Sequence, residues 1–219
     1  MTPLRQTSFR NRLAPVLFVT LLLSALLIAV VSAAHLITRP VVERNRTRYL
    51  QRAVLEAAGW TVPASSSQME ALFESRARLV PEAPDAPFAV VQDPGGRDDR
   101  LVFLETGRGL WGPIQAAVAF SSLDGAMAGL AFVAHNETPG LGARIEEPAF
   151  RRQFIGKRPP LALSSSASTG SPNPSEMDGL TGATITSQGV RDLINRAAQR
   201  VRPDIKSATP TAPEMLLER

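Results

Sequence analysis

The chain has 219 residues and a modest net charge of +4, from 24 basic and 20 acidic side chains. The absence of cysteine excludes disulfides and thiolate metal sites. The basic residues are dispersed and aromatic residues make up only 5%, which argues against a nucleic-acid-binding surface.

Residues 13–37 form an apolar run without Asp, Glu, Lys or Arg. A helix of roughly 20 such residues spans the core of a bilayer, so we expect a transmembrane helix here. A cleavable signal peptide is the alternative, since Ser32-Ala33-Ala34 resembles a cleavage site. The run exceeds the about 7–15 residues of a signal-peptide core, which favours the uncleaved anchor. Arginines lie on both sides of the run, so charge alone does not orient it.

The segments after this run predict helices and then strands. Residues 40–58 are expected to continue outward as a helix that Gly59 ends. A second helix is expected after Ser65–Ser67, ended by prolines, and its apolar stripe comprises Met69, Leu72, Phe73 and Ala77. The prolines are Pro81, Pro84 and Pro87. Strands separated by turn residues are expected over 88–92, 101–105, 115–120 and 130–134. They should be antiparallel because no helix-length crossover separates them.

The C-terminal third predicts a short helix over 148–154, a mobile low-complexity loop over 164–174 and an amphipathic helix from near Gln188. That last helix has a core-facing stripe and is ended by Pro203. The stripe consists of Val190, Leu193, Ile194, Ala197, Ala198 and Val201. The predicted fold class is therefore α+β: a twisted, mainly antiparallel sheet with flanking helices, tethered by one N-terminal transmembrane helix.

Two glycine-containing loops are candidates for a binding site. In GRGLWGPI, residues 107–114, Trp111 is either the packed indole of a hairpin or a flat face for a ligand. In HNETPGLGARIEE, residues 135–147, a tight turn is expected at 138–140. Glu137 and His135 there are either an acid or base, or structural partners of the loop backbone. The only other histidine lies in the apolar run, so we expect no histidine metal site.

A third loop, DGLTGATITSQGV, covers residues 178–190. Gly182 and Ala183 leave the backbone uncovered there, and we expect exposed hydroxyls at Thr184 and Thr186. Ser187 is expected to cap the following helix. The unpaired N–H groups of a helix start suit a phosphate, although an ordinary capping turn has the same composition.

DGLTGAT resembles the flavinylation motif Asp-Gly-x-Ser/Thr-Gly-Ala-Thr of the FMN-binding domain family. In that family a flavin transferase moves FMN from FAD onto the last threonine, as a phosphoester. The resemblance implies one covalent FMN on Thr184. It also implies that the recognition positions are filled by Asp178, Gly179, Thr181, Gly182 and Ala183.

Further segments are similar to the C subunits of sodium-translocating NADH:quinone oxidoreductases: residues 39–60, 107–114, 137–142 and 150–157. The G subunit of the Rnf complex shares the anchor, the ETPGLG loop and the flavinylation motif. The resemblance implies a flavin next to Trp111 or Leu141, with further contacts from Glu137, Thr138, Gly140, Gly142 and Thr186, and no metal.

The function implied is electron transfer within a membrane respiratory complex, the Na+-transporting NADH:ubiquinone reductase, with other subunits and the flavin transferase as partners. The chain should not act on NADH alone, because it has no Rossmann or Walker glycine pattern. In the bacterial inner membrane, residues 1–12 would be cytoplasmic, 13–37 transmembrane, 38–203 a periplasmic FMN-binding domain and 204–219 a flexible tail. The alternatives are membership of the Rnf complex, a stand-alone periplasmic flavin carrier, and a membrane-anchored binding module without redox function.

Overall fold

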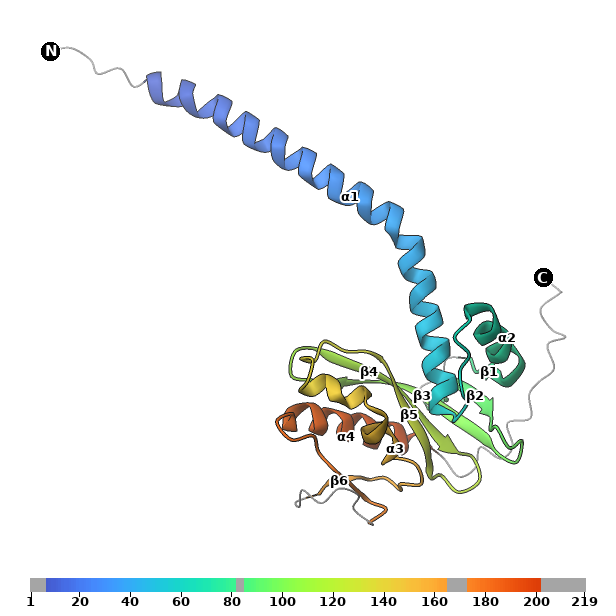
Figure 1. Cartoon of the computed structure of the whole chain (residues 1–219). Coiled ribbons are helices and arrows are strands. Elements are labelled where there is room, and N and C mark those ends of the chain that lie inside the picture. Colours follow the sequence, from blue (N-terminus) through green and yellow to red (C-terminus); the bar gives the residue numbers. More distant parts are fainter. Residues whose placement is uncertain (1–6, 82–84, 165–172, 202–219) are drawn as a thin grey trace. The chain divides into compact units, whose positions relative to one another are not determined.

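The computed structural model describes residues 7–81, 85–164 and 173–201 (Figure 1). The chain divides into two compact units, Met1–Thr47 and Arg48–Arg219, which we describe separately. Several sequence-based predictions lie outside the described residues: the role of Pro84, most of the loop over 164–174, the stop at Pro203 and the tail over 204–219.

Helix α1 (Thr7–Ala57) supplies the first unit and continues into the second. The predicted helices over 13–37 and 40–58 are both confirmed as parts of this one helix, with Pro40 in its interior. The large apolar side chains between Val16 and Val42 are all more than half exposed. Within the described residues, α1 is the one helix long and apolar enough to cross a membrane. Gly59, at φ +93°, follows its end as predicted.

The second unit contains a five-stranded antiparallel sheet whose strands are neighbours in chain order. The antiparallel arrangement of the four predicted strands is confirmed. The five strands are β1 (Ala77–Leu79), β2 (Ala89–Gln92), β3 (Asp99–Arg108), β4 (Pro113–Ser121) and β5 (Met127–Ala134).

The chain from Ala77 to Gly107 departs from the prediction at two places. Helix α2 (Ser66–Arg76) ends before the prolines, because Ala77 is already extended and pairs with Val91. The prediction that Ala77 belongs to the apolar stripe of this helix is therefore wrong. Strand β3 continues through Gly107, which the sequence analysis assigned to the loop over residues 107–114, and Gly107 pairs with Ile114.

Both faces of the sheet are covered (Figure 1). Along β4, alternate residues enter two different cores, as the period of two in a strand requires. Val118 and Phe120 pack toward helix α4 (Thr184–Gln199), whereas Ala117 and Ala119 pack with the last turns of α1 and with α2. On that second face the backbone carbonyl of Ala57 lies so close to β5 that a Cβ at Gly129 would be 2.5 Å from it.

The core-facing stripe of α4 is confirmed, with Val190, Leu193, Ile194 and Ala197 all buried. The start of this helix is not where the sequence placed it. Helix α4 begins at Thr184, so the assignment of Ser187 as its N-cap is wrong.

Four smaller elements complete the described part of the unit. The short helix predicted over 148–154 is present as α3 (Pro148–Arg152). A 3-10 helix, η1 (Gly142–Glu146), precedes it. The parallel pair of β6 (Ala162–Leu163) and β7 (Glu176–Met177) was not predicted.

Candidate cofactor site

The three glycine-containing loops meet at the buried carboxylate of Glu137, which is 5% exposed. Its Oε1 accepts hydrogen bonds from the backbone N–H groups of Leu110 and Trp111, at 2.9 and 3.1 Å. Its Oε2 accepts a hydrogen bond from the hydroxyl of Thr186 in the first turn of α4. We call Glu137, these three partners and the adjacent Gly109 and Gly142 the Glu137 cluster.

Two glycines of the cluster leave space for that carboxylate. A Cβ at Gly142 would lie 2.5 Å from Oε2 of Glu137 and 2.9 Å from the hydroxyl oxygen of Thr186. A Cβ at Gly109 would overlap Oε1 and would lie 2.8 Å from the carbonyl oxygen of Gly112. Any side chain at either position would therefore push the carboxylate away from its donors.

The segment before α4 makes a turn that presents Thr184 to solvent. Gly182 has φ +80°, a conformation that favours glycine, and the Ala183 N–H donates to the carbonyl of Leu180 at 3.0 Å. Thr184 then opens the helix with an exposed side chain. The first turn itself contains no acidic residue, and the nearest carboxylate established at this helix start is Glu137, which accepts the Thr186 hydroxyl.

Of the two hydroxyls expected to be exposed, Thr184 is exposed but Thr186 is buried. Thr186 points into the Glu137 cluster because it follows Thr184 by two residues, which places it on another side of the helix. Ser187 is also buried. Its hydroxyl donates to the carbonyl of Ala183 at 3.0 Å and accepts the Leu180 N–H at 2.9 Å, so it stabilises the turn from inside the helix.

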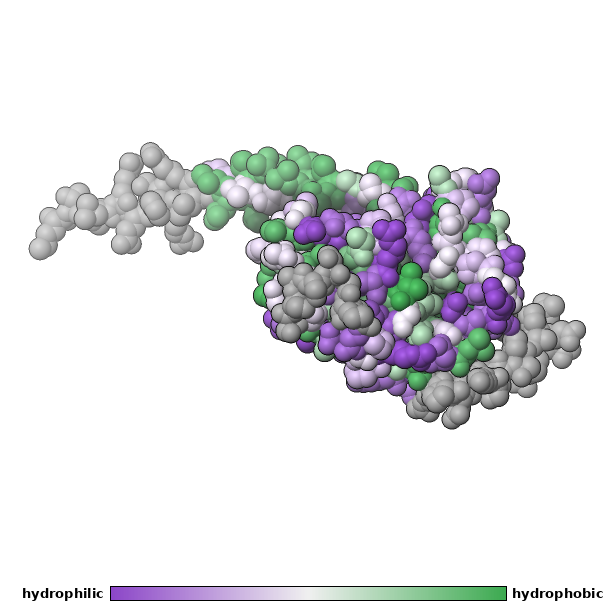
Figure 2. All heavy atoms as spheres, turned by 60° about the horizontal axis from the view of Figure 1, so that its bottom comes forward, coloured by the Kyte–Doolittle hydropathy of each residue, from purple (hydrophilic) through white to green (hydrophobic). Residues whose placement is uncertain are grey.

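Large apolar side chains are exposed on all three loops. Trp111 is 66% exposed, which contradicts the interpretation of a packed indole. Leu110, Leu141 and Ile185 are each about half exposed. The loops of Leu141 and Thr184 adjoin, because a Cβ at Gly182 would lie 3.5 Å from Cδ2 of Leu141. Figure 2 shows one face of the molecule, on which scattered apolar side chains lie among polar ones.

Ile185 was missed in the sequence, although a signal was available. It lies between the two candidate threonines and falls outside the periodic stripe that begins at Val190. An apolar residue off the buried stripe of a helix is expected to face solvent or a ligand.

The remaining residues of the DGLTGAT motif lie before the turn. The backbone of Asp178 is held by the side chain of Gln153, which accepts its N–H at 2.7 Å and donates to its carbonyl at 3.3 Å. Gly179 and Thr181 are exposed. Gln153 thus connects the motif to the end of α3, a link that the sequence did not predict.

Thr138 and Gly140 shape the ETPGLG turn. The carbonyl of Thr138 accepts the N–H groups of Leu141 and Ala143, each at 3.1 Å, and Gly140 has φ +75°. His135 is a structural partner here. Its Nδ1 accepts the Glu137 N–H at 3.2 Å, and its Nε2 lies 3.1 Å from the Glu146 carboxylate. Among the described residues, no group of three or more potential metal ligands occurs.

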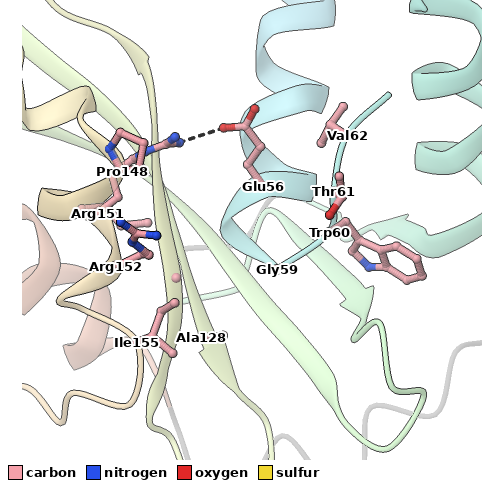
Figure 3. Close-up of a pocket in the computed structure, with 12 residues that line it drawn as sticks. Glu56, Gly59, Trp60, Thr61, Val62, Ala128, Pro148, Arg151, Arg152 and Ile155 are labelled. Atoms are coloured by element: carbon pink, nitrogen blue, oxygen red, sulfur yellow. Dashed lines mark hydrogen bonds and ion pairs between the residues drawn. The ribbon is translucent and has the colours of Figure 1, made fainter. Parts of the chain in front are cut away.

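A hollow of about 340 Å³ lies elsewhere on the unit, between the end of α1, β5 and α3 (Figure 3). Glu56 and Arg151 form an ion pair of 2.8 Å across it. Trp60 and Ile155 also line it, but none of the predicted site residues does. The Glu137 cluster and this hollow are thus separate features.

Comparison with known proteins finds similarities that include most of the three loops. Residues 109–199 match the FMN-binding domain family. The C subunit of the Na(+)-translocating NADH-quinone reductase of Yersinia pestis is 35% identical over 48% of this chain and 42% of its own length. The same subunit of Pseudomonas aeruginosa is 28% identical over 80% of this chain and 88% of its own.

The corresponding C subunit from Vibrio anguillarum is 31% identical, and the match spans 58% of its length. The match therefore spans about half the length of the Yersinia and Vibrio relatives. A crystal structure of the C subunit from Parabacteroides distasonis shares the fold, with a TM-score of 0.61 and 22% identity over 77% of this chain and 97% of that one. Residues 109–199 of this chain are thus similar to the FMN-binding domain family, and the chain is similar to the C subunits of Na(+)-translocating NADH-quinone reductases.

Proposed function

We propose that the chain is the electron-transferring C subunit of a Na+-translocating NADH:quinone oxidoreductase and carries one FMN, joined to Thr184 by a phosphoester. One observation supports this most. The last threonine of a complete DGLTGAT motif is exposed at the start of α4, and its own loop and the two other loops present apolar side chains to solvent.

The residues around Thr184 fit a flavin nucleotide. The diester keeps one negative charge, which the start of a helix stabilises by roughly 0.3–1 kcal/mol. Trp111 and Leu141 offer flat or apolar contact area to the isoalloxazine ring, and Leu110 and Ile185 extend that area. The positive φ of Gly182 turns the chain just before the attachment point, and Ala183 adds no bulk there.

Attachment requires a flavin transferase with FAD as donor. The Thr184 oxygen forms a bond to the phosphorus of the FMN half, the bond between the two FAD phosphates breaks, AMP leaves and the hydroxyl proton is released. Asp178, Gly179, Thr181, Gly182 and Ala183 are the positions that the transferase would read. Gly179 and Thr181 are exposed enough to be reached by an enzyme.

When bound, FMN supplies one-electron redox chemistry. The chain's own residues hold and orient it and exclude water from part of the ring. Glu137 is engaged by three donors, so we assign it no acid–base role. Thr138, Gly140 and Gly142 form the tight turn that carries Leu141. We assign to these three residues only backbone contacts with the ring.

The proposal includes the complex and the membrane. Helix α1 would anchor the chain in the bacterial inner membrane through residues 13–37, with residues 1–12 cytoplasmic and the FMN-binding domain, residues 38–203, periplasmic. The other subunits would supply NADH oxidation and quinone reduction.

Substitution of the attachment hydroxyl tests the proposal. In cells that contain the flavin transferase, Thr184→Ala should yield a folded protein without flavin fluorescence after denaturing electrophoresis. Thr138→Ala is the matched control, since it removes another exposed hydroxyl from an adjacent loop and should keep the fluorescent band. A fluorescent Thr184→Ala band would refute the assignment. Co-purification of the wild-type chain with the other subunits tests its place in the complex.

A further inference from the structure

We propose that Glu137 is a positioning residue that fixes the Leu110–Trp111 pair relative to the start of α4, and so sets where the ring-contacting side chains lie relative to Thr184. The part of this inference that concerns the flavin ring rests on the proposed function. The hydrogen bonds of Glu137 do not depend on it. The two oxygens of one carboxylate bind two different elements: the loop after β3 and the first turn of α4.

The chemistry of this contact makes it specific. A buried carboxylate is costly unless hydrogen bonds satisfy it. Its partners here are two backbone N–H groups and one hydroxyl, all uncharged donors. An ion pair would bind one side chain, whereas these donors bind the loop backbone itself. A shift of this loop that moved the Leu110 and Trp111 N–H groups away would leave the buried Glu137 carboxylate without two of its donors.

The absence of side chains at Gly109 and Gly142 leaves the carboxylate in close contact on both sides. It therefore has no room for a second position, and the loop and the helix turn are held at a fixed separation. The close packing at Gly109 and Gly142 therefore fixes the position of the Glu137 carboxylate in addition to its hydrogen bonds.

The strand before this loop is anchored in another way. A Cβ at Gly107 would lie 2.9 Å from the carbonyl oxygen of Gly189, so β3 and α4 are in direct backbone contact. That contact does not involve Glu137. Glu137 thus controls the loop beyond Arg108, where Leu110 and Trp111 lie, and not the strand. The effect of its removal should be equally local.

Amide hydrogen exchange on the full chain before FMN attachment tests this without reference to the cofactor. Glu137→Ala should speed exchange at Leu110 and Trp111 about tenfold, the change expected on losing a charge-assisted hydrogen bond. Exchange at Phe103 in β3 should stay unchanged. Glu137→Gln should remain within about threefold of wild type, because its amide oxygen still accepts both N–H groups.

Glu146→Ala is the matched control: Glu146 comes from the same region but pairs with His135 at the surface. Unchanged exchange at Leu110 and Trp111 in Glu137→Ala, or equal acceleration in Glu146→Ala, would overturn the proposal. Should Glu137→Ala not fold, Thr186→Val tests the same cluster from the helix side, and unchanged exchange there would also overturn it.

A second readout uses the flavinylated protein. Glu137→Ala should keep the covalent FMN, because Thr184 is intact, but the bound flavin should lose fluorescence anisotropy as its contacts with Trp111 loosen. An anisotropy equal to wild type would contradict the positioning role. If wild-type protein carries no FMN at all, the proposed function fails, and the exchange result still decides the role of Glu137.

Discussion

Two carboxylates on the second unit, one partly exposed and one buried, have partners of different kinds. Glu56 lines the hollow between α1, β5 and α3, is about one-third exposed, and pairs with the Arg151 cation. Glu137 is buried and binds only uncharged donors from two other loops. The hollow is the more obvious concavity, yet the DGLTGAT motif lies beside the Glu137 cluster. The proposed cofactor site is therefore marked by hydrogen bonds between loops and not by a concave surface.

The largest effect on stability should come from filling the space beside Glu137. Gly142→Ala places a methyl group 2.5 Å from the carboxylate and should lower the free energy of unfolding by about 2–3 kcal/mol, as overpacking does. Gly179→Ala is the control, because its Cβ meets its nearest neighbour at 3.6 Å. Chemical denaturation of protein without FMN measures both, and equal losses would show that the cluster is not closely packed.

The Glu56–Arg151 pair should matter less. Glu56→Gln removes one charge of a partly exposed ion pair, which is worth about 0.2–1 kcal/mol. The covalent flavin should be unaffected, since the hollow contains no residue of the predicted site. Chemical denaturation measures the change in stability, and in-gel fluorescence measures the covalent flavin. Loss of flavin in this variant would mean that the two regions are coupled.

Replacing the exposed indole should change the flavin but hardly the fold. Trp111→Ala should alter the free energy of unfolding by less than about 0.5 kcal/mol, because the side chain is 66% exposed. The fluorescence of bound FMN should rise, since an indole in contact with the ring quenches it. Trp60→Phe is the control: Trp60 donates to the Gln92 carbonyl and contacts Arg76, away from the three loops. Equal flavin emission in both variants would remove Trp111 from the site.

The smallest effect concerns acid stability at the turn between β4 and β5, where Asp124 belongs neither to the lining of the hollow nor to the Glu137 cluster. The Ala126 N–H, the Ser121 hydroxyl and the Arg158 guanidinium hold the pKa of Asp124 below its ordinary value of 3.8. A lowered pKa in the folded state stabilises the fold above pH 3.8, and that contribution is lost as the pH falls through the folded-state pKa.

Thermal unfolding between about pH 3 and 5 measures this contribution. Asp124→Asn should flatten the decline of the melting temperature on acidification. A decline as steep as that of the wild type would show that the interactions of Asp124 do not contribute.

Much of the fold was predictable because it follows simple periodicities. The stripe of α4 identifies its buried face directly from the sequence, and turn residues separate the strands that were predicted. The start of α4 was misplaced because Ser187 has the chemistry of an N-cap, whereas the actual N-cap, Ala183, makes no side-chain hydrogen bond. The pairing of β6 with β7 involves two residues on each side, too few to show a period.

The candidate site was only partly predictable. The motif predicts Thr184 as the attachment residue without any structure, and this stays a prediction. The burial of Glu137 could not be predicted from its sequence context, because charged side chains are rarely buried. The same holds for Thr186, because the partner of its buried hydroxyl, Glu137, lies on a different loop. Contacts between loops about 27 and 49 residues apart leave no local pattern.

Peptide mass analysis of wild-type chain, purified from cells that contain the flavin transferase, tests the central claim most directly. The account predicts a peptide containing Thr184 whose mass is increased by one FMN less one water, with fragmentation that places the added group on that side chain. An unmodified Thr184 in such cells, or the same added mass on another residue, would contradict it.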